Sequence, residues 1–181
     1  MSASSECFAA VISDAPGFES RWRDVLARWE PEYPGDYNAM LEFASYLVEQ
    51  YQVGDTSCFA AVFAKVEHCA QSGDWEVLNL ISVGLFENIQ NLSSHRPIGQ
   101  AVFLRWLGPK SRQLWDNMNE VWAELAELER QGRLVEKAPW WQFWRRSRSM
   151  VANGTSLDTM LQNVTNPDLR RIIESMHRRR R

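Results

Sequence analysis

Glu67, His68 and Cys69 come closest to a chemical site, because all three residue types can bind a metal ion and they are consecutive. Adjacent residues of a helix point about 100° apart, so these side chains cannot easily share one ion. The chain contains neither an H-E-x-x-H motif nor paired C-x-x-C motifs. We therefore expect no metal site. His95, in a polar segment without a recognisable nucleophile, is interpreted as a structural loop residue.

Carboxylates are the other groups that could do chemistry. Glu42 and Glu49 are seven residues apart on one face of an expected helix, while Glu67, Glu76 and Glu87 belong to neighbouring helices. A buried carboxylate pair stays open, although di-iron bundles use Glu-x-x-His motifs that this chain lacks. The glycine-rich loops that bind nucleotide phosphates are also missing. The sequence predicts no catalytic residue and no cofactor, and hence a binding protein instead of an enzyme.

Opposite charges divide the 181 residues into two segments. Residues 1–138 contain 11 Lys and Arg against 20 Asp and Glu, whereas residues 139–181 contain 9 against 3. Such asymmetry concerns partners and solubility, not the fold. We expect an acidic helical bundle at 1–138, followed at 139–181 by a Trp- and Arg-rich segment, two short helices and a basic tail.

The acidic residues of the bundle are interpreted in two ways. They form either a solvated surface or a docking face that attracts a basic partner, because complementary charge accelerates encounter. The residues of that face would be Glu30, Glu32, Asp36, Glu42, Glu49, Glu67 and Glu87.

A cluster of aromatic and basic residues begins the C-terminal segment. It comprises Trp140, Trp141, Trp144, Arg145 and Arg146. These tryptophans either fold back onto the bundle, where each buries roughly 150–250 Å², or form a partner-binding hot spot. Binding to a membrane surface or to nucleic acid is a further alternative, but the acidic bundle argues against nucleic acid. The Arg178–Arg181 tail is interpreted as a solvated end, with folding onto the acidic bundle as the alternative.

The compartment is inferred from segments that the sequence lacks. No apolar run approaches the roughly 18–20 residues that span a bilayer, and the N-terminus does not have the pattern of a signal peptide. Cys7, Cys58 and Cys69 are an odd number at unrelated spacings, which favours reduced, mostly buried thiols. A cytoplasmic protein without a transmembrane segment is expected.

Helical periodicity dominates the chain and strand patterns are essentially absent. We expect an all-α fold, a bundle of about seven helices with a short helical C-terminal appendage. The helices are expected to begin near Ser4, Phe18, Asp36, Phe59, Trp75, Pro97 and Pro109. Asp36 and Asp74 are expected to cap the third and fifth of them. Apolar spacing predicts a buried stripe on the second helix that includes Trp29, and an amphipathic last helix that ends at Gly132. The segment from Trp75 to about Leu92 is nearly apolar all round, so it should form the buried centre, with Gly84 permitting a close helix crossing.

Several motifs resemble a bacterial helical domain family of unknown function, over roughly residues 8–122. They are Trp29-Glu-Pro-Glu-Tyr-Pro34, Val62-Phe63-Ala-Lys-Val66-Glu67, Gly84-Leu-Phe-Glu87 and Leu107-Gly108-Pro109. The resemblance implies an immunity protein, because members of this family are read as the antitoxins of neighbouring secreted toxins. The expected partner is a cognate toxin with a basic active-site face, neutralised by binding and occlusion. The alternatives are a metal-dependent hydrolase using Glu67 and Glu87, and an adaptor that binds through Trp140–Arg148.

Overall fold

The computed structural model describes residues 2–94, 96–132, 167, 170–171 and 174. All regular elements among these residues are helical, and no strand occurs among them, which confirms the all-α fold. The chain forms two compact units, Met1–Trp115 and Asp116–Arg181. The predicted boundary after residue 138 lies outside the described residues and stays a prediction.

Two helices and a short 3-10 turn begin the first unit: α1 (Ala3–Ile12), η1 (Pro16–Phe18) and α2 (Glu19–Trp29). The hydroxyl of Ser2, not that of Ser4, caps α1 by accepting from the Ser5 N–H at 3.2 Å. On α2 only Val25 is fully buried. The predicted buried stripe of α2 therefore does not extend to Trp29, which is 42% exposed in the last turn of the helix.

The next two helices, α3 (Asp36–Gln52) and α4 (Phe59–Gln71), bury the apolar faces that their periodicity predicts. The prediction that Asp36 caps α3 was wrong. The cap position is Gly35, with φ of 82°, and no side chain caps the helix there. Asp36 is instead the first helical residue, and its carboxylate accepts hydrogen bonds from serines of α1.

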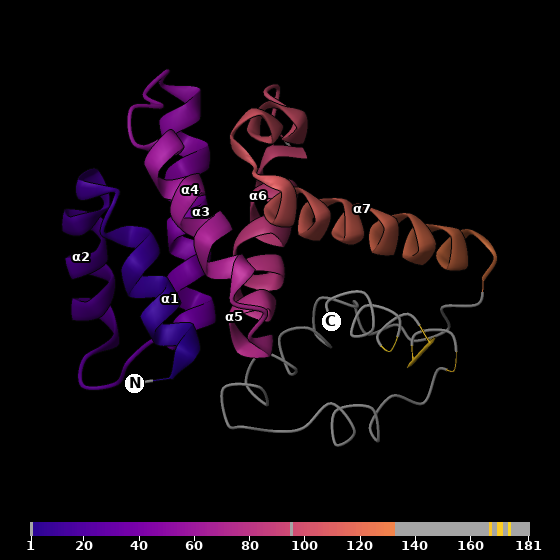
Figure 1. Cartoon of the computed structure of the whole chain (residues 1–181), viewed down its shortest axis with the longest axis horizontal. Coiled ribbons are helices and arrows are strands. Elements are labelled where there is room, and N and C mark those ends of the chain that lie inside the picture. Colours follow the sequence, from indigo (N-terminus) through magenta and orange to yellow (C-terminus); the bar gives the residue numbers. More distant parts are fainter. Residues whose placement is uncertain (1, 95, 133–166, 168–169, 172–173, 175–181) are drawn as a thin grey trace. The chain divides into compact units, whose positions relative to one another are not determined.

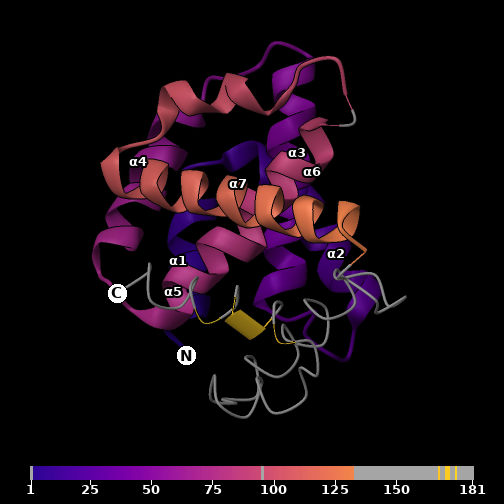
Figure 2. The ribbon, with the colours of Figure 1, turned by 90° about the vertical axis from the view of Figure 1, so that its right-hand side faces the viewer.

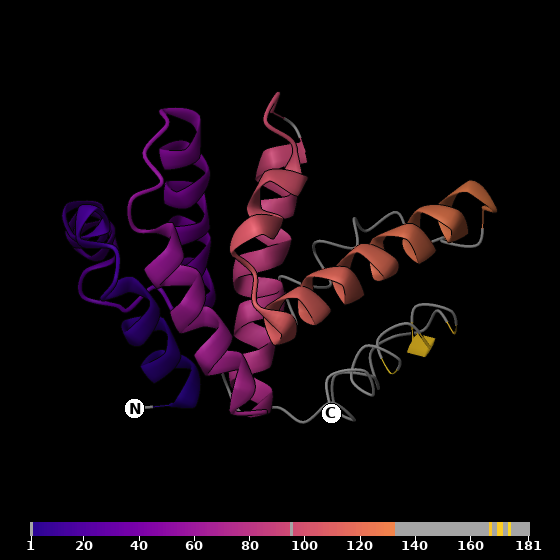
Figure 3. The same cartoon turned by 45° about the horizontal axis from the view of Figure 1, so that its top comes forward.

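A single helical column is made of α5 (Trp75–Asn79), η2 (Leu80–Phe86) and α6 (Glu87–Ser94), and it lies on the side of α3 opposite α2 (Figures 1 and 3). Asp74 caps it as predicted, by accepting from the N–H groups of Glu76 and Val77. Every residue of η2 is buried, and η2 is a π-helix, which the periodicity did not predict. Both η2 and α6 pack on α3, while α1 packs on α4 and α5. Figure 2 shows α6 beside α3.

Gly84 allows η2 and α3 to approach closely, as predicted. A Cβ atom at this position would lie 3.1 Å from Leu80 Cδ1 and 3.2–3.3 Å from Met40 Cγ and Cβ. These distances are shorter than ordinary van der Waals contact, so a side chain here would require its neighbours to move.

The last elements are the 3-10 helix η3 (Gln100–Trp106) and α7 (Pro109–Arg130). Pro97 does not begin η3 as predicted, because Gly99 takes the cap position with φ of 65°. Phe103 and Trp106 of η3 contact Phe59 and Phe63 of α4, with ring centroids 4.9–6.4 Å apart. α7 ends before Gly132, which has φ of 65°, as predicted.

Glu67 of α4 anchors the first turn of α7. Its Oε1 accepts from the Lys110 N–H at 3.0 Å, and its Oε2 accepts from the Ser111 N–H at 2.7 Å and from the Ser111 hydroxyl. A carboxylate at a helix N-terminus satisfies N–H groups that have no partner within the helix. A side chain at Gly108 would displace this carboxylate, because a Cβ there would lie 2.5 Å from Glu67 Cδ.

In the second unit, the described part of α7 carries one buried apolar stripe. Its members are Met118, Val121, Leu125 and Leu128. Glu120, Glu124 and Glu129 are exposed and Glu127 is half-buried, so the predicted amphipathic pattern is confirmed for these residues.

Replacing Gly84 with valine should lower the free energy of unfolding by about 1–3 kcal/mol, because the branched side chain overpacks the crossing between η2 and α3. Urea unfolding followed by circular dichroism measures the change. The matched control is Ala64→Val on the exposed side of α4, expected to cost roughly 0.5 kcal/mol or less. Equal losses for both variants would contradict the close crossing.

Replacing Glu67 with glutamine should destabilise the protein by about 1–2 kcal/mol near neutral pH. The reason is that the N–H groups of α7 would then donate to a neutral amide instead of a charged carboxylate. Partial burial raises the pKa of Glu67, but hydrogen bonds from Ser111, Lys110 and Gln71 outweigh this effect and lower the pKa. A lowered pKa gives stability that is present above the unfolded value and is lost as the carboxylate is protonated.

The difference between wild type and Glu67→Gln should therefore shrink as the pH falls from about 5 to about 3. Urea unfolding at several pH values measures it. Glu32→Gln, which removes the same charge from an exposed position, should cost almost nothing at any of these pH values. A Glu67→Gln effect that does not change with pH would contradict the anchoring role of the carboxylate.

Candidate functional site

The loop between α2 and α3 presents aromatic and acidic side chains together at the surface. Trp29 is 42% and Tyr33 is 53% exposed, and Glu30 and Glu32 are exposed beside them. Val53, in the loop after α3, is the third large exposed hydrophobic side chain among the residues described. We call Trp29, Glu30, Glu32 and Tyr33 the aromatic–acidic loop, and it is the candidate functional site.

Hydrogen bonds and ring contacts hold this loop in place. The Glu32 N–H donates to the Trp29 carbonyl at 2.8 Å, which closes a turn that contains the cis Glu30–Pro31 peptide. The Tyr33 ring meets Trp22 edge-on at 6.3 Å, and Trp22 in turn contacts Phe8 at 5.1 Å. The loop is therefore attached to the apolar interior through Tyr33.

Asp36 connects the loop to α1. The Tyr33 hydroxyl donates to Asp36 Oδ1 at 3.1 Å, while the Ser4 and Ser5 hydroxyls donate to Oδ2 at 2.6 and 2.9 Å. Partial burial and the negative charge of Asp36 raise the pKa of Tyr33, so the phenol stays protonated and donates. Asp36 thus positions Tyr33 instead of offering an open carboxylate to a partner.

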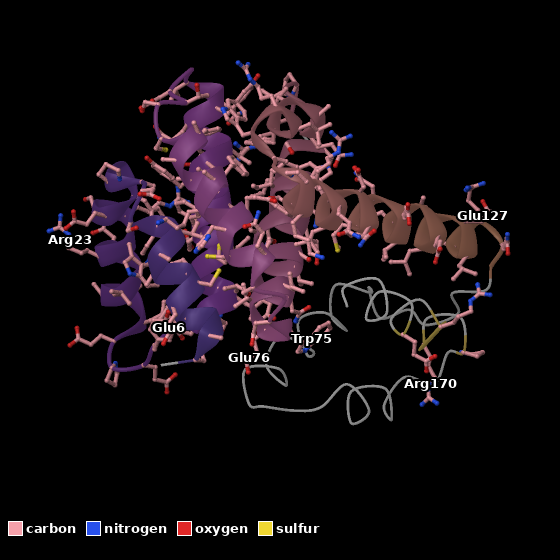
Figure 4. The ribbon with its side chains drawn as sticks, viewed as in Figure 1. Glu6, Arg23, Trp75, Glu76, Glu127 and Arg170 are labelled. Carbon is pink, nitrogen blue, oxygen red and sulfur yellow. The ribbon has the colours of Figure 1, made fainter. Side chains whose placement is uncertain are left out.

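Glu42 and Glu49 of α3 form ion pairs with α2. Arg21 lies 3.2 Å from Glu42 and 2.7 Å from Glu49, and Arg28 lies 3.6 Å from Glu42. Arg23, between them in sequence, points away from the helices (Figure 4). The charges of both glutamates are therefore balanced within the unit, so this edge is not the open acidic surface that the sequence suggested.

The remaining predicted residues are not brought into the aromatic–acidic loop. Glu67 anchors α7, and Glu87 is buried, with 2% of its surface exposed. A buried carboxylate is not available at the surface, so Glu87 does not belong to a docking face. Among the described residues, no group of three or more His, Cys, Asp or Glu could hold a metal ion. Trp140, Trp141, Trp144, Arg145 and Arg146 lie outside the described residues.

The sequence therefore identified Glu30 and Glu32 but missed Trp29 and Tyr33. Trp29 continues the apolar periodicity of α2, so the pattern assigned it to the buried face. Its exposure could have been predicted from its position in the last helical turn before Pro31, because no further turn follows to cover it. Tyr33 lies between two prolines, outside any helix face.

Three comparisons with known proteins and one property of the helices bear on what kind of protein this chain is. None of the described helices is long and apolar enough to cross a membrane. No curated protein and no solved structure matches the chain. Residues 8–123 match the family model described as a domain of unknown function, DUF7674. The sequence predicted a family of unknown function over nearly the same residues, and that part of the prediction is confirmed. The chain belongs to the DUF7674 family.

Proposed function

We propose that this protein is a non-enzymatic immunity protein, which neutralises a cognate toxin by binding it directly and covering its active site. The observation that supports the proposal is the aromatic–acidic loop, where two exposed aromatic rings lie beside two exposed carboxylates. The expected partner has a basic active-site face, because Glu30 and Glu32 would attract lysine and arginine side chains. We further propose that the protein acts in the cytoplasm.

The aromatic rings would supply most of the affinity. Trp and Tyr are enriched among the few residues that carry the binding energy of protein interfaces. Tyr33 is already held by Trp22 and Asp36, so binding would cost little additional ordering of its side chain. The carboxylates would contribute mainly to the rate of encounter and to the choice of partner.

The metal-dependent hydrolase considered from the sequence has no comparable support. Glu67, on which it depends, accepts hydrogen bonds from two backbone N–H groups and a hydroxyl of α7. Glu87, its intended partner, is a buried residue of α6. Occlusion of a toxin requires neither residue to react.

The proposal is tested by identifying the partner and then measuring protection. The tagged full-length chain is used to capture proteins from the source cells, and native mass spectrometry gives the stoichiometry of the complex. The captured protein is then expressed in a host with and without this chain. Growth arrest that one equivalent of this chain relieves supports the proposal. A captured protein that is harmless to the host, or that remains active when saturated with this chain, contradicts it.

Replacing Trp29 with alanine should weaken binding to the captured toxin by about 2 kcal/mol or more, which is roughly 30-fold in Kd. Calorimetry or surface plasmon resonance measures the change. Val53→Ala is the matched control, because Val53 is exposed and hydrophobic but lies outside the loop, and its Kd should stay within about twofold. Equal affinities of wild type and Trp29→Ala would place the interface elsewhere.

Reversing both loop charges, with Glu30→Lys and Glu32→Lys, should slow association most strongly at low salt, by roughly tenfold or more. Stopped-flow measurements at several salt concentrations determine the rate. Glu19→Lys with Asp24→Lys changes the net charge by the same amount on exposed positions of α2. A similar loss of rate in both double variants would mean that net charge matters and that the loop itself does not.

A further inference from the structure

Few buried side chains attach α2 to the rest of the first unit. Among its eleven residues only Val25 is fully buried, whereas α3 buries eight of its seventeen residues. α2 packs closely on η1, while α3 packs closely on α1, η2 and α6. Figure 1 shows α2 at the edge of the first unit. Apolar burial therefore contributes less to the position of α2 than to that of α3.

Ion pairs with α3 supply a further part of the attachment. The Arg21 guanidinium bridges two carboxylates, with Nη1 2.7 Å from Glu49 Oε2 and Nη2 3.2 Å from Glu42 Oε2. Arg28, near the end of α2, lies 3.6 Å from the other oxygen of Glu42. These four side chains are between 30% and 65% exposed, so dissolved ions reach them and screen their attraction.

Trp22 joins α2 to the aromatic groups of the interior. Its ring centroid lies 5.1 Å from that of Phe8 in α1 and 6.2 Å from that of Phe18 in η1. The same ring supports Tyr33 of the aromatic–acidic loop, and Trp29 of that loop is the last residue of α2. A displacement of α2 therefore moves Trp29 and removes the ring that supports Tyr33.

The two ends of this segment are buried, although most of the segment is not. Phe18, before α2, is 1% exposed and contacts Phe43 of α3 with ring centroids 4.9 Å apart. Phe18 also takes the cap position of α2, and no side-chain hydrogen bond caps the helix there. Pro34, after the loop, is buried, and Gly35 follows it with φ of 82°. Residues 19–33 can thus move between two buried anchors without unpacking α3.

We propose that residues 19–33 form a salt-sensitive flap. It opens as one unit when its ion pairs with α3 are screened, and opening takes the aromatic–acidic loop out of its binding arrangement. Proteins open locally in cooperative segments at a lower free energy than global unfolding, and few buried apolar contacts mark such segments. The consequence for partner binding rests on the proposed function, whereas the opening itself does not.

The test measures amide hydrogen exchange of the full-length chain without any partner, at low and at high sodium chloride. Mass spectrometry with fragmentation assigns the exchange to single residues. At low salt the amides of α2 should exchange at least roughly tenfold faster than those of α3 and η2. Added salt should accelerate exchange in α2 and leave α3 and η2 unchanged. Amides in the middle of α2 should show similar protection, because one opening exposes them all.

Two variants of α2 separate the ion pairs from the charge of the helix. Arg21→Gln removes the bridging guanidinium, and it should accelerate exchange in α2 by roughly five- to tenfold at low salt. It should also remove most of the response to added salt. Arg23→Gln is the matched control, because Arg23 is exposed on the same helix and points away from the helices (Figure 4). Exchange in this control should stay within about twofold of wild type and keep its response to salt.

Three results would overturn the inference. One is protection of α2 equal to that of α3 and η2 at both salt concentrations. Another is an effect of salt or of Arg21→Gln that has the same size in all three elements, since this means global destabilisation. The third is protection that increases steadily from the ends of α2 to its middle, which indicates fraying. The salt series uses the wild-type chain, so it decides the question even where Arg21→Gln fails to fold. No toxin is present, so a failure of the proposed immunity function leaves these results unchanged.

Discussion

The burial of one continuous segment constrains the rest of the first unit. Every residue from Val77 to Gln90 is buried, so this column cannot lie on a surface and needs helices around it. Each large apolar side chain buried there contributes about 1.5–3 kcal/mol, and its polar groups must find partners. The N–H groups of three side-chain amides do: Asn79 donates to the Tyr37 hydroxyl at 2.5 Å, Asn88 to the Gly84 carbonyl at 2.6 Å and Gln90 to the Trp115 carbonyl at 3.3 Å.

Contacts between the helices of the first unit use four of the carboxylates that make the sequence acidic. Asp36 receives the serine hydroxyls of α1, Arg21 joins Glu42 and Glu49, and Glu67 anchors α7. Each of these acids is therefore explained by a contact between helices. A negative net charge in the sequence thus does not imply a continuous acidic surface. The loop that Pro31 and Pro34 prevent from becoming helix differs from the other exposed acidic positions, because its carboxylates lie beside two exposed aromatic rings.

The sequence predicted what depends on local periodicity and missed what depends on distant partners. The buried faces of α3 and α4 follow from apolar spacing, and the Asp74 cap follows from residues within three positions of it. The main partners of Asp36 lie more than thirty residues before it in the chain, and those of Glu67 lie more than forty after it. Rules based on residue spacing within one helix cannot identify such distant pairs, so Asp36 and Glu67 were assigned to the acidic docking face. The exposure of Trp29 was missed because apolar periodicity indicates which face of a helix is buried, but not where along the helix the burial ends.

α1 connects the aromatic–acidic loop with the packed interior of the first unit. At its first turn, Ser4 and Ser5 donate to the carboxylate that also accepts from Tyr33. Further along the helix, Cys7, Phe8 and Val11 are buried, and α1 packs on α3, α4 and α5. Both sets of contacts act on the same short helix, so a displacement of α1 relative to α3 would change the serine partners of Asp36 and, with them, the support of Tyr33. The burial of the apolar side of α1 opposes such a displacement, because it would expose apolar surface to water. The interior packing of α1 therefore holds the serines where Asp36 needs them, and a loop at the surface depends on side chains buried in the core.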